Sequence, residues 1–428
     1  MQGVLVIPQS LAARQAAEAG ARAVPPHLPR TAPTRVGWPV ACIFSMLAAL
    51  CGCSSAHVHV SRADALRYGI SAAAAAVALL PSASHASSLS PVGRDAALLY
   101  DTRSALFMPA DPQRRLRTAL DGGNVPRVFF AGEEHTHRLH HAMQLELIKA
   151  VDGLDGAPTL IGLEMCYRQQ QPALDAFVFG SPERGGGDID LLRRRTSWES
   201  TWGYPIELYA AILSYAREHR LRLCGLNAPY QVVQEVSRVG LSGLRPELRQ
   251  MLPDVDLTNS DHRRRFAEAI GSVMPQIDRP LAAVAGGAVA GDAMHGPMDS
   301  GDFERMYEAM TLWDEFMASS IAGYVRPEPM MGAGPFGGKS LGTERMVVLV
   351  GSAHVRGRVG IPDRFAKRSK LATFTMVPAR WEAAGRPAAE ERLPPSEADW
   401  VLYTRPQSAR EELSLVSARR LAREAIFL

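Results

Sequence analysis

The chain has 428 residues, of which 46% are hydrophobic and 21% charged, and this composition excludes a disordered or fibrous protein. The formal net charge of +3 is too small to indicate a nucleic-acid-binding protein, and no segment repeats at a fixed period. Only two of the five cysteines, Cys166 and Cys224, lie beyond residue 53, which excludes a disulfide framework in the body of the chain. We expect these two as buried thiols on neighbouring strands rather than as a bridge.

The N-terminal segment 1–86 has the composition of a targeting sequence. It holds six arginines but only two acidic residues, and it is rich in Ala, Ser and Pro. Small residues at Ser84 and Ala86 fit the positions before a signal-peptidase cleavage site. Two apolar runs follow arginines and are too short to span a membrane comfortably, at 40–53 and 72–80.

A transit segment followed by a signal-like segment resembles the two-part targeting of proteins sent to the thylakoid lumen of plastids. This interpretation predicts a mature chain that begins near Ser87 and contains no transmembrane span. A bacterial lipoprotein lipidated at Cys53 is the alternative, although about fifty residues before the lipidation site exceed an ordinary signal peptide. A flexible tail that is never cleaved is the simplest alternative.

Beyond this segment, predicted strands and helices alternate. Short apolar runs rich in β-branched or aromatic residues predict strands, and apolar residues at helical spacing predict helices. The expected strands are 125–131, 159–163, 221–226, 346–350, 373–377 and 401–404, and the expected helices are 140–151, 208–219, 262–273 and 302–324. This order indicates an α/β domain in which helices cover both faces of a largely parallel sheet.

We place this α/β domain at 97–385 and a C-terminal strand and helix at 386–428. The segments 280–301 and 326–342, rich in Ala, Gly, Pro or Met, look like inserted loops. In a parallel α/β sheet the ligand binds at the carboxyl ends of the strands. Polar residues lie at the ends of four of the predicted strands: Glu133, Glu134, His135, Glu164, Asn227 and His354.

Two Gly-x-x-His motifs lie at these strand ends. Gly132-Glu-Glu-His135 opens a cluster of four histidines, in which His137 and His141 would share one face of a helix. Gly351-Ser-Ala-His354 repeats the pattern after another apolar strand. Imidazole and carboxylate groups bind metals and act as acids and bases, so these motifs predict a site. The alternative is a solvated helix start whose acidic residues favour the helix dipole.

Three further residues join this prediction with their own alternatives. Glu164 follows an apolar strand and is either a site residue or a helix N-cap. Tyr167 and Tyr204 are candidate contacts for haem or a substrate, although such aromatic residues are more often simply packed.

An ordered set of short motifs resembles the ChaN-like haem-binding uptake family of the Tiki, TraB and erythromycin-esterase superfamily. The resemblance covers roughly residues 97–380. One departure is Met310, which stands four residues before Asp314 where the family tends to have glutamine. The motifs are GEEH at 132–135, HHAMQ at 140–144, GLEM at 162–165, Trp198 and Trp202, GLN-x-P at 225–229, WDEFMA at 313–318 and GSAH at 351–354.

The resemblance implies an α/β fold and a haem or related tetrapyrrole as the ligand, bound by a homodimer in the best-known members. It also implies a tyrosine ligand, for which Tyr167 and Tyr204 are the candidates. The expected cofactor-binding residues are His135, His137, His141, Tyr167, Tyr204 and His354.

A metal-dependent hydrolase is the alternative function, because the wider superfamily includes metal-dependent peptidases. His135, Glu164 and His354 would then bind a divalent metal ion, and Glu133 and Glu164 would be the catalytic carboxylates. A third hypothesis is a scaffold that keeps the fold without any activity. We rank haem binding, for haem or iron handling, above hydrolysis.

Overall fold

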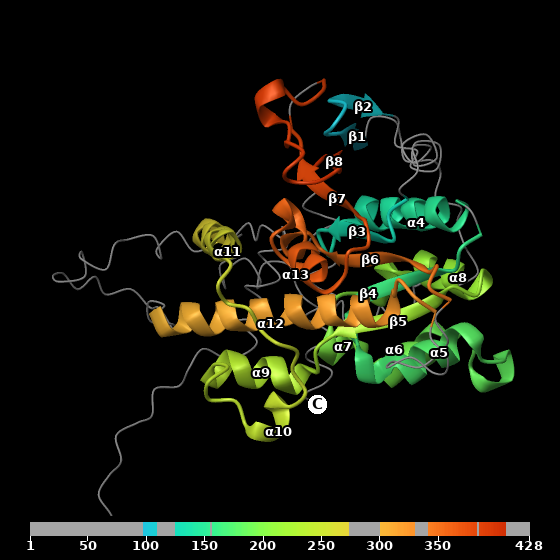
Figure 1. The fold of residues 1–428 in the computed structure, drawn as a ribbon. Coiled ribbons are helices and arrows are strands. Elements are labelled where there is room, and N and C mark those ends of the chain that lie inside the picture. The colour runs from blue at the N-terminus through green and yellow to red at the C-terminus, as the bar shows by residue number, and fades with distance from the viewer. Residues whose placement is uncertain are drawn as a thin grey trace, which may run out of the picture. The chain divides into compact units, whose positions relative to one another are not determined.

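The fold is described from a computed structural model, in residues 97–108, 125–154, 156–273, 300–329, 341–382 and 385–407. Within these residues eight strands form one sheet, in the order β2-β1-β8-β7-β3-β6-β4-β5 (Figure 1). Apolar, β-branched and aromatic residues fill these strands, which suits a sheet buried on both faces. The strands are β1 (Ala97–Asp101), β2 (Leu106–Met108), β3 (Val128–Glu133), β4 (Thr159–Tyr167), β5 (Arg222–Asn227), β6 (Arg345–Gly351), β7 (Thr373–Arg380) and β8 (Trp400–Thr404).

Six of these strands, β3 to β8, run parallel, and only β1 and β2 pair antiparallel at one edge of the sheet. β8 lies between β1 and β7, so the C-terminal strand predicted as a separate region belongs to this sheet. The α/β architecture with a largely parallel sheet is therefore confirmed.

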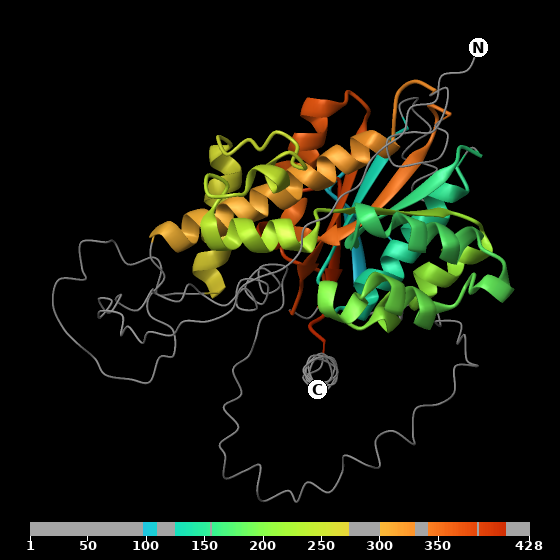
Figure 2. The same cartoon turned by 90° about the horizontal axis from the view of Figure 1, so that it is seen from below.

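Helices cover both faces of the sheet, and Figure 2 shows the strands between the two helical layers. One layer holds α4, α5 and α8, and the other holds α9, α12 and α13. The helices are α4 (Arg138–Asp152), α5 (Gln171–Phe179), α6 (Ile189–Thr196), α7 (Trp198–Thr201), α8 (Ala210–Glu218), α9 (Tyr230–Val239), α10 (Pro246–Arg249), α11 (Ser260–Val273), α12 (Ser300–Tyr324) and α13 (Ile361–Arg368).

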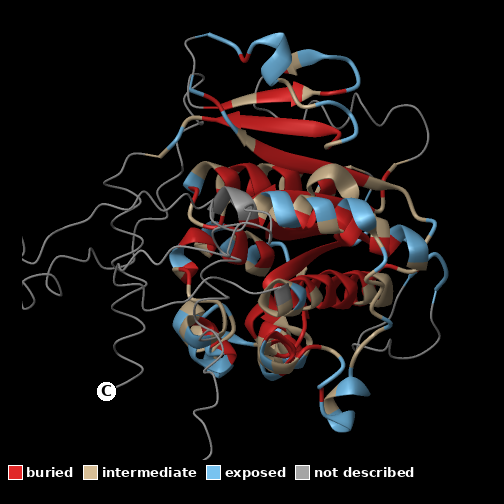
Figure 3. Cartoon of the chain, turned by 90° about the vertical axis from the view of Figure 1, so that its left-hand side faces the viewer, coloured by how far each residue is buried: buried red, intermediate tan, exposed pale blue. Residues whose placement is uncertain are grey.

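Each face of the sheet has its own apolar core, because successive side chains of a strand point to opposite faces. On β3, Val128 and Phe130 face α12 and α13, whereas Phe129 and Ala131 face α4 and α8. The central strands are buried along nearly their whole length, and the helices expose only their outer sides (Figure 3).

Cys166 on β4 and Cys224 on β5 are both free and buried, as predicted. Cys166 belongs to the core under α4 and α8, and Cys224 belongs to the core under α12. The two thiols therefore point to opposite faces of the sheet. Burial raises the pKa of Cys166 to about 12 and also raises the pKa of Cys224.

The predicted strands and helices agree with the structure to within a few residues, with one instructive exception. The strand predicted at 159–163 continues to Tyr167, and its register with β5 shifts between Leu163 and Tyr167. Glu164 therefore lies inside β4, at this irregularity, rather than after its end.

Some predictions lie outside the described residues: the targeting segment 1–86, most of the two inserted loops, and the C-terminal helix. Within the described part of the chain, no helix combines the length and the apolar character that a membrane span requires.

Candidate functional site

The Glu133 cluster lies at the carboxyl end of β3, with Glu133 at its centre. Glu133 is completely buried, and four donors surround its two carboxylate oxygens. Oε1 accepts hydrogen bonds from His135 Nδ1 at 2.9 Å and from the Tyr209 hydroxyl at 2.6 Å. Oε2 accepts one from Gln144 Nε2 at 2.7 Å and lies 3.4 Å from His141 Nδ1. The donors come from α4, the β3–α4 loop and the residue before α8, so the cluster ties three segments together.

The charges in this cluster stabilise one another. Burial alone would raise the pKa of Glu133, but His141 and His135 more than reverse this and hold it well below its usual value. Burial alone would lower the pKa of His141, whereas Glu133 raises it. An ionised carboxylate thus forms a buried ion pair with a protonated imidazole.

The ring of His135 packs against two aromatic side chains. Its ring centroid lies 4.7 Å from that of Trp202, edge-on, and 4.9 Å from that of Tyr204. Its Nδ1 donates to Glu133, while its Nε2 makes no hydrogen bond to any residue in the described ranges. A histidine held in this way by a carboxylate has one ring nitrogen fixed and the other available to a ligand.

His137 and His140 form a stacked pair at the start of α4. Their ring centroids are 3.9 Å apart with an interplanar angle of 8°. The Glu134 backbone N–H donates to His140 Nδ1 at 3.0 Å, so His140 Nε2 carries the proton and donates to the Thr404 hydroxyl. His137 Nε2 donates to the Arg405 carbonyl at 3.1 Å. This pair therefore connects α4 to the end of β8. Burial, His137 and His141 hold the pKa of His140 well below its usual value.

The His354 cluster lies on the opposite face of the sheet, after β6. His354 is buried between two carboxylates, with Nδ1 2.6 Å from Asp314 Oδ1 and Nε2 3.3 Å from Glu164 Oε1. The Gly351 backbone N–H donates to Glu164 Oε2 at 2.6 Å. Gly351 and His354, which belong to the same Gly-x-x-His motif, therefore both contact the carboxylate of Glu164.

A second layer of charged groups surrounds Asp314 on α12. Asp314 Oδ2 lies 3.0 Å from His262 Nε2 of α11 and 3.8 Å from Arg364 Nη1 of α13. Arg364 is 1% exposed, and its Nε also lies 3.2 Å from Glu315 Oε1. Arg364 Nη2 also donates to His262 Nδ1 at 3.2 Å. The cluster therefore joins three helices through buried ion pairs and hydrogen bonds.

The electrostatics of this second cluster favour a cationic imidazole. Burial alone would lower the pKa of His354, but Glu164 and Asp314 raise it to about 10. Burial alone would raise the pKa of Asp314, but His354 and His262 hold it well below its usual value.

The family model described as "Haem-binding uptake, Tiki superfamily, ChaN" matches residues 124–365, which include both clusters. The chain belongs to this ChaN-like haem-binding family. A comparison with curated proteins found no match.

Three solved structures are distantly similar to this member of the ChaN-like family. Campylobacter jejuni ChaN, in a structure of cofacial heme binding to that protein, has 14% identity and a TM-score of 0.49, covering 73% of this chain and 98% of that chain. An erythromycin esterase mutant in its open conformation has 14% identity and a TM-score of 0.35, covering 75% and 87%. A Bacillus cereus protein has 12% identity and a TM-score of 0.32, covering 64% and 71%. These similarities are too distant to assign a function.

In this ChaN-like chain the predicted site residues fall into two groups. His135, His141 and Tyr204 lie in or beside the Glu133 cluster. Glu164 and His354 contact each other in the His354 cluster. The predicted residues His137 and Tyr167 lie apart from these contacts. His137 stacks on His140, and the Tyr167 hydroxyl donates to the Thr201 carbonyl at 3.2 Å.

The structure does not bring the three predicted metal ligands together, because His135 lies in the Glu133 cluster whereas Glu164 and His354 lie in the His354 cluster. The metal site therefore stays a prediction. In the ranges that the structure describes, no group of three or more His, Cys, Asp or Glu side chains is arranged to hold a metal ion.

Sequence reasoning missed His262, which had no strand-end motif and comes from a helix far away in the chain. Asp314 and Gln144 stood within recognised motifs of the ChaN-like family, WDEFMA and HHAMQ, but no role was assigned to them. A carboxylate within the apolar helix 302–324 was the available signal for Asp314, because buried charges need partners.

Proposed function

We propose that this protein binds haem or a related tetrapyrrole at the Glu133 cluster, for haem or iron handling. The observation that carries the proposal is the arrangement of His135. Its Nδ1 is fixed by the buried Glu133 carboxylate at 2.9 Å, and Trp202 and Tyr204 flank its ring. Family membership supports the same ligand.

The residues of this cluster suit a haem. His135 would hold the haem iron through its Nε2, because Glu133 orients its ring by the hydrogen bond at Nδ1. Flat aromatic rings such as those of Trp202 and Tyr204 pack well against a planar macrocycle. Of the two candidate tyrosines, Tyr204 lies beside His135 and is therefore favoured over Tyr167. A bound haem would supply the iron centre, while these residues position it and exclude water.

Hemin titration followed by absorbance tests this proposal. The wild-type protein should shift the Soret band with saturation, and His135→Ala should weaken binding at least about 10-fold. His219→Ala is the matched control, because this imidazole is 43% exposed and lies outside both clusters. A wild-type titration indistinguishable from buffer would overturn the proposal, and so would equal affinity of His135→Ala and wild type.

A metal-dependent hydrolase is the second candidate, favoured by the contact of Glu164 with His354 at 3.3 Å. In this function the two residues would bind the metal ion together with His135, and Glu133 would activate water. Because His135 and Glu133 lie in the other cluster, this function also requires a rearrangement that brings the two clusters together. Metal analysis of the purified protein and of Glu164→Gln tests it. A wild-type protein without bound zinc, manganese or iron contradicts it.

We also propose plastid import to the thylakoid lumen, and dimer formation with haem. The acid-poor segment 1–86 supports the first proposal. Sequencing the N-terminus of the mature protein tests it, with a start near Ser87 expected and a start well upstream as the contrary result. Light scattering with and without hemin tests the second, since a monomer in both states contradicts it.

A further inference from the structure

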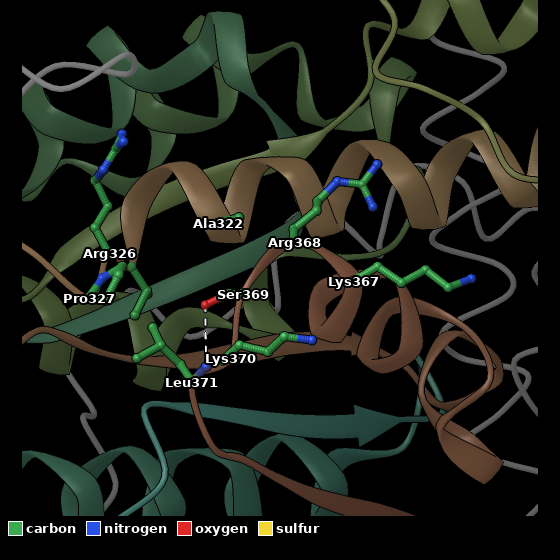
Figure 4. Close-up of a pocket in the computed structure, with 9 residues that line it drawn as sticks. Ala322, Arg326, Pro327, Lys367, Arg368, Ser369, Lys370 and Leu371 are labelled. Atoms are coloured by element: carbon green, nitrogen blue, oxygen red, sulfur yellow. Dashed lines mark hydrogen bonds between the residues drawn. The ribbon is translucent and has the colours of Figure 1, made fainter.

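A cavity of about 420 Å³ lies far from the carboxyl ends of the strands, where α13 leads into β7. Its walls come from the end of α12, from the end of α13 and from the segments that follow these two helices (Figure 4). A cavity of this size can hold a small organic ligand. Its lining residues are Ala322, Val325, Arg326, Pro327, Lys367, Arg368, Ser369, Lys370 and Leu371.

The cavity lining contains four basic side chains and no acidic one. Two of the four already have acidic partners. Lys367 Nζ lies 3.0 Å from Asp256 and 2.9 Å from Asp363, and Arg368 Nη2 lies 2.7 Å from Glu315. Their charges are therefore largely compensated by the protein itself.

Arg326 and Lys370 differ from this pair, because neither side chain has an acidic partner in the described part of the chain. In Figure 4 the Lys370 side chain starts beside Ser369, whereas the Arg326 guanidinium extends away from the Ser369 hydroxyl. Ser369 Oγ accepts a long hydrogen bond of 3.4 Å from the Leu371 N–H, so its own proton can be donated to a ligand. The cavity lining thus includes two basic side chains without an acidic partner in the described residues, and a hydroxyl donor.

The rest of the lining is apolar: Ala322, Val325, Pro327 and Leu371. Basic residues at the ends of α12 and α13 also stabilise the helix dipoles, but that role needs neither a cavity nor an apolar wall. Two positive charges match a dianion, and arginine and lysine are the side chains that bind phosphate best. An apolar wall in the same cavity suits a carbon skeleton attached to that phosphate.

We propose that this cavity binds a small, soluble phosphate monoester. When the ligand binds, the long Arg326 side chain turns from its position in Figure 4 toward Ser369 and pairs with the dianionic phosphate together with Lys370, and Ser369 donates a hydrogen bond to it. The carbon skeleton packs on Val325 and Leu371. This site is independent of the Glu133 cluster, so it does not depend on the proposed haem binding.

Calorimetric titration of the full chain with phenyl phosphate and with inorganic phosphate tests the proposal. Phenyl phosphate should bind more tightly, because only it uses the apolar wall. The double substitution Arg326→Ala with Lys370→Ala should weaken phenyl phosphate binding at least about 10-fold, since it removes both charges. The matched control is Arg194→Ala with Arg195→Ala, which removes two exposed charges on α6 and should bind as wild type does.

Several outcomes overturn the proposal. They are the absence of phenyl phosphate binding at millimolar concentration, equal affinity of the two double variants, and equal affinity for phosphate and phenyl phosphate. A fourth is binding to phosphatidic acid vesicles, dependent on Arg326 and Lys370, without any binding of phenyl phosphate, because this would assign the charges to a membrane surface. Circular dichroism checks that both double variants are folded.

Discussion

The two buried clusters at the carboxyl side of the sheet have opposite charges at their centres, a carboxylate in one and an imidazole in the other. In the first, the carboxylate of Glu133 is central, and imidazole, phenol and amide groups donate to it. In the second, the imidazole of His354 is central, and two carboxylates lie against its two nitrogens. His135 keeps Nε2 for a ligand, whereas both ring nitrogens of His354 are used within the protein. We infer that the Glu133 cluster serves ligand binding and that the His354 cluster joins α11, α12 and α13.

The largest effect is expected from Asp314→Asn, which breaks the second cluster. It removes the charge that faces His354, His262 and Arg364, and a buried arginine cannot relieve the loss by deprotonation. Unfolding in urea at pH 7 should show a loss of about 3–5 kcal/mol in the free energy of unfolding.

The control for this substitution is Asp190→Asn, whose carboxylate is 70% exposed and pairs with Arg193. It should change the free energy of unfolding by less than about 1 kcal/mol. Equal effects of the two substitutions would show that the buried ion pairs are not needed for stability.

The second largest effect that we expect is a loss of stability at alkaline pH, which comes from the His354 cluster. The pKa of His354 is raised from 6.5 to about 10 in the folded protein, so its ion pairs contribute fully below pH 6.5 and are lost as pH rises to about 10. The stability difference between wild type and His354→Gln should shrink by a few kcal/mol over this range. Urea unfolding at the two pH values measures it. Parallel pH profiles of the two proteins would contradict the role of His354.

A smaller effect on stability is expected from Glu133→Gln in the first cluster. Glutamine keeps the shape and one acceptor oxygen, and His141 can lose its proton when its carboxylate partner is removed. We expect a loss of about 1–3 kcal/mol in unfolding free energy. Because His135 also loses its charged partner, hemin affinity should fall by about 10–100-fold. Unchanged hemin affinity would show that Glu133 does not contribute to hemin binding.

The smallest effect is expected from Glu134→Gln, although Glu134 is the neighbour of Glu133 in the chain. The Glu134 side chain, which is 13% exposed, pairs at 3.2 Å with the 38% exposed guanidinium of Arg380. Such a pair contributes less than about 1 kcal/mol, and hemin affinity should not change. A loss as large as that of Glu133→Gln would mean that the two carboxylates act as one group.

The sequence predicted the six parallel strands well, because runs such as Met346–Val350 are apolar throughout and suit a buried parallel sheet, but it did not predict the edge strands β1 and β2. It did not predict to which face of the sheet each carboxylate side chain points. Ala131 and Leu163 both align with Leu349 of β6, so Glu133, two residues on, and Glu164, one residue on, point to opposite faces. This follows from strand register, which pairs segments more than 180 residues apart and cannot be read from either motif alone.

The contact of His262 with Asp314 was equally beyond sequence reasoning. It depends on how α11 packs against α12, and the two residues have no shared motif. The strand-end histidines were found because a glycine and a buried strand precede them. A histidine within a helix carries no such signal.

The placement of Cys166 and Cys224 on opposite faces makes each thiol a reporter of its own core. Each sulfur reacts with an alkylating reagent only when the helices above it open, since burial protects the thiol and disfavours the reactive thiolate. The labelling rate of Cys166 therefore follows the opening of the layer that holds the Glu133 cluster. The labelling rate of Cys224 follows the opening of the layer tied together by the His354 cluster, so one experiment compares the opening kinetics of the two halves.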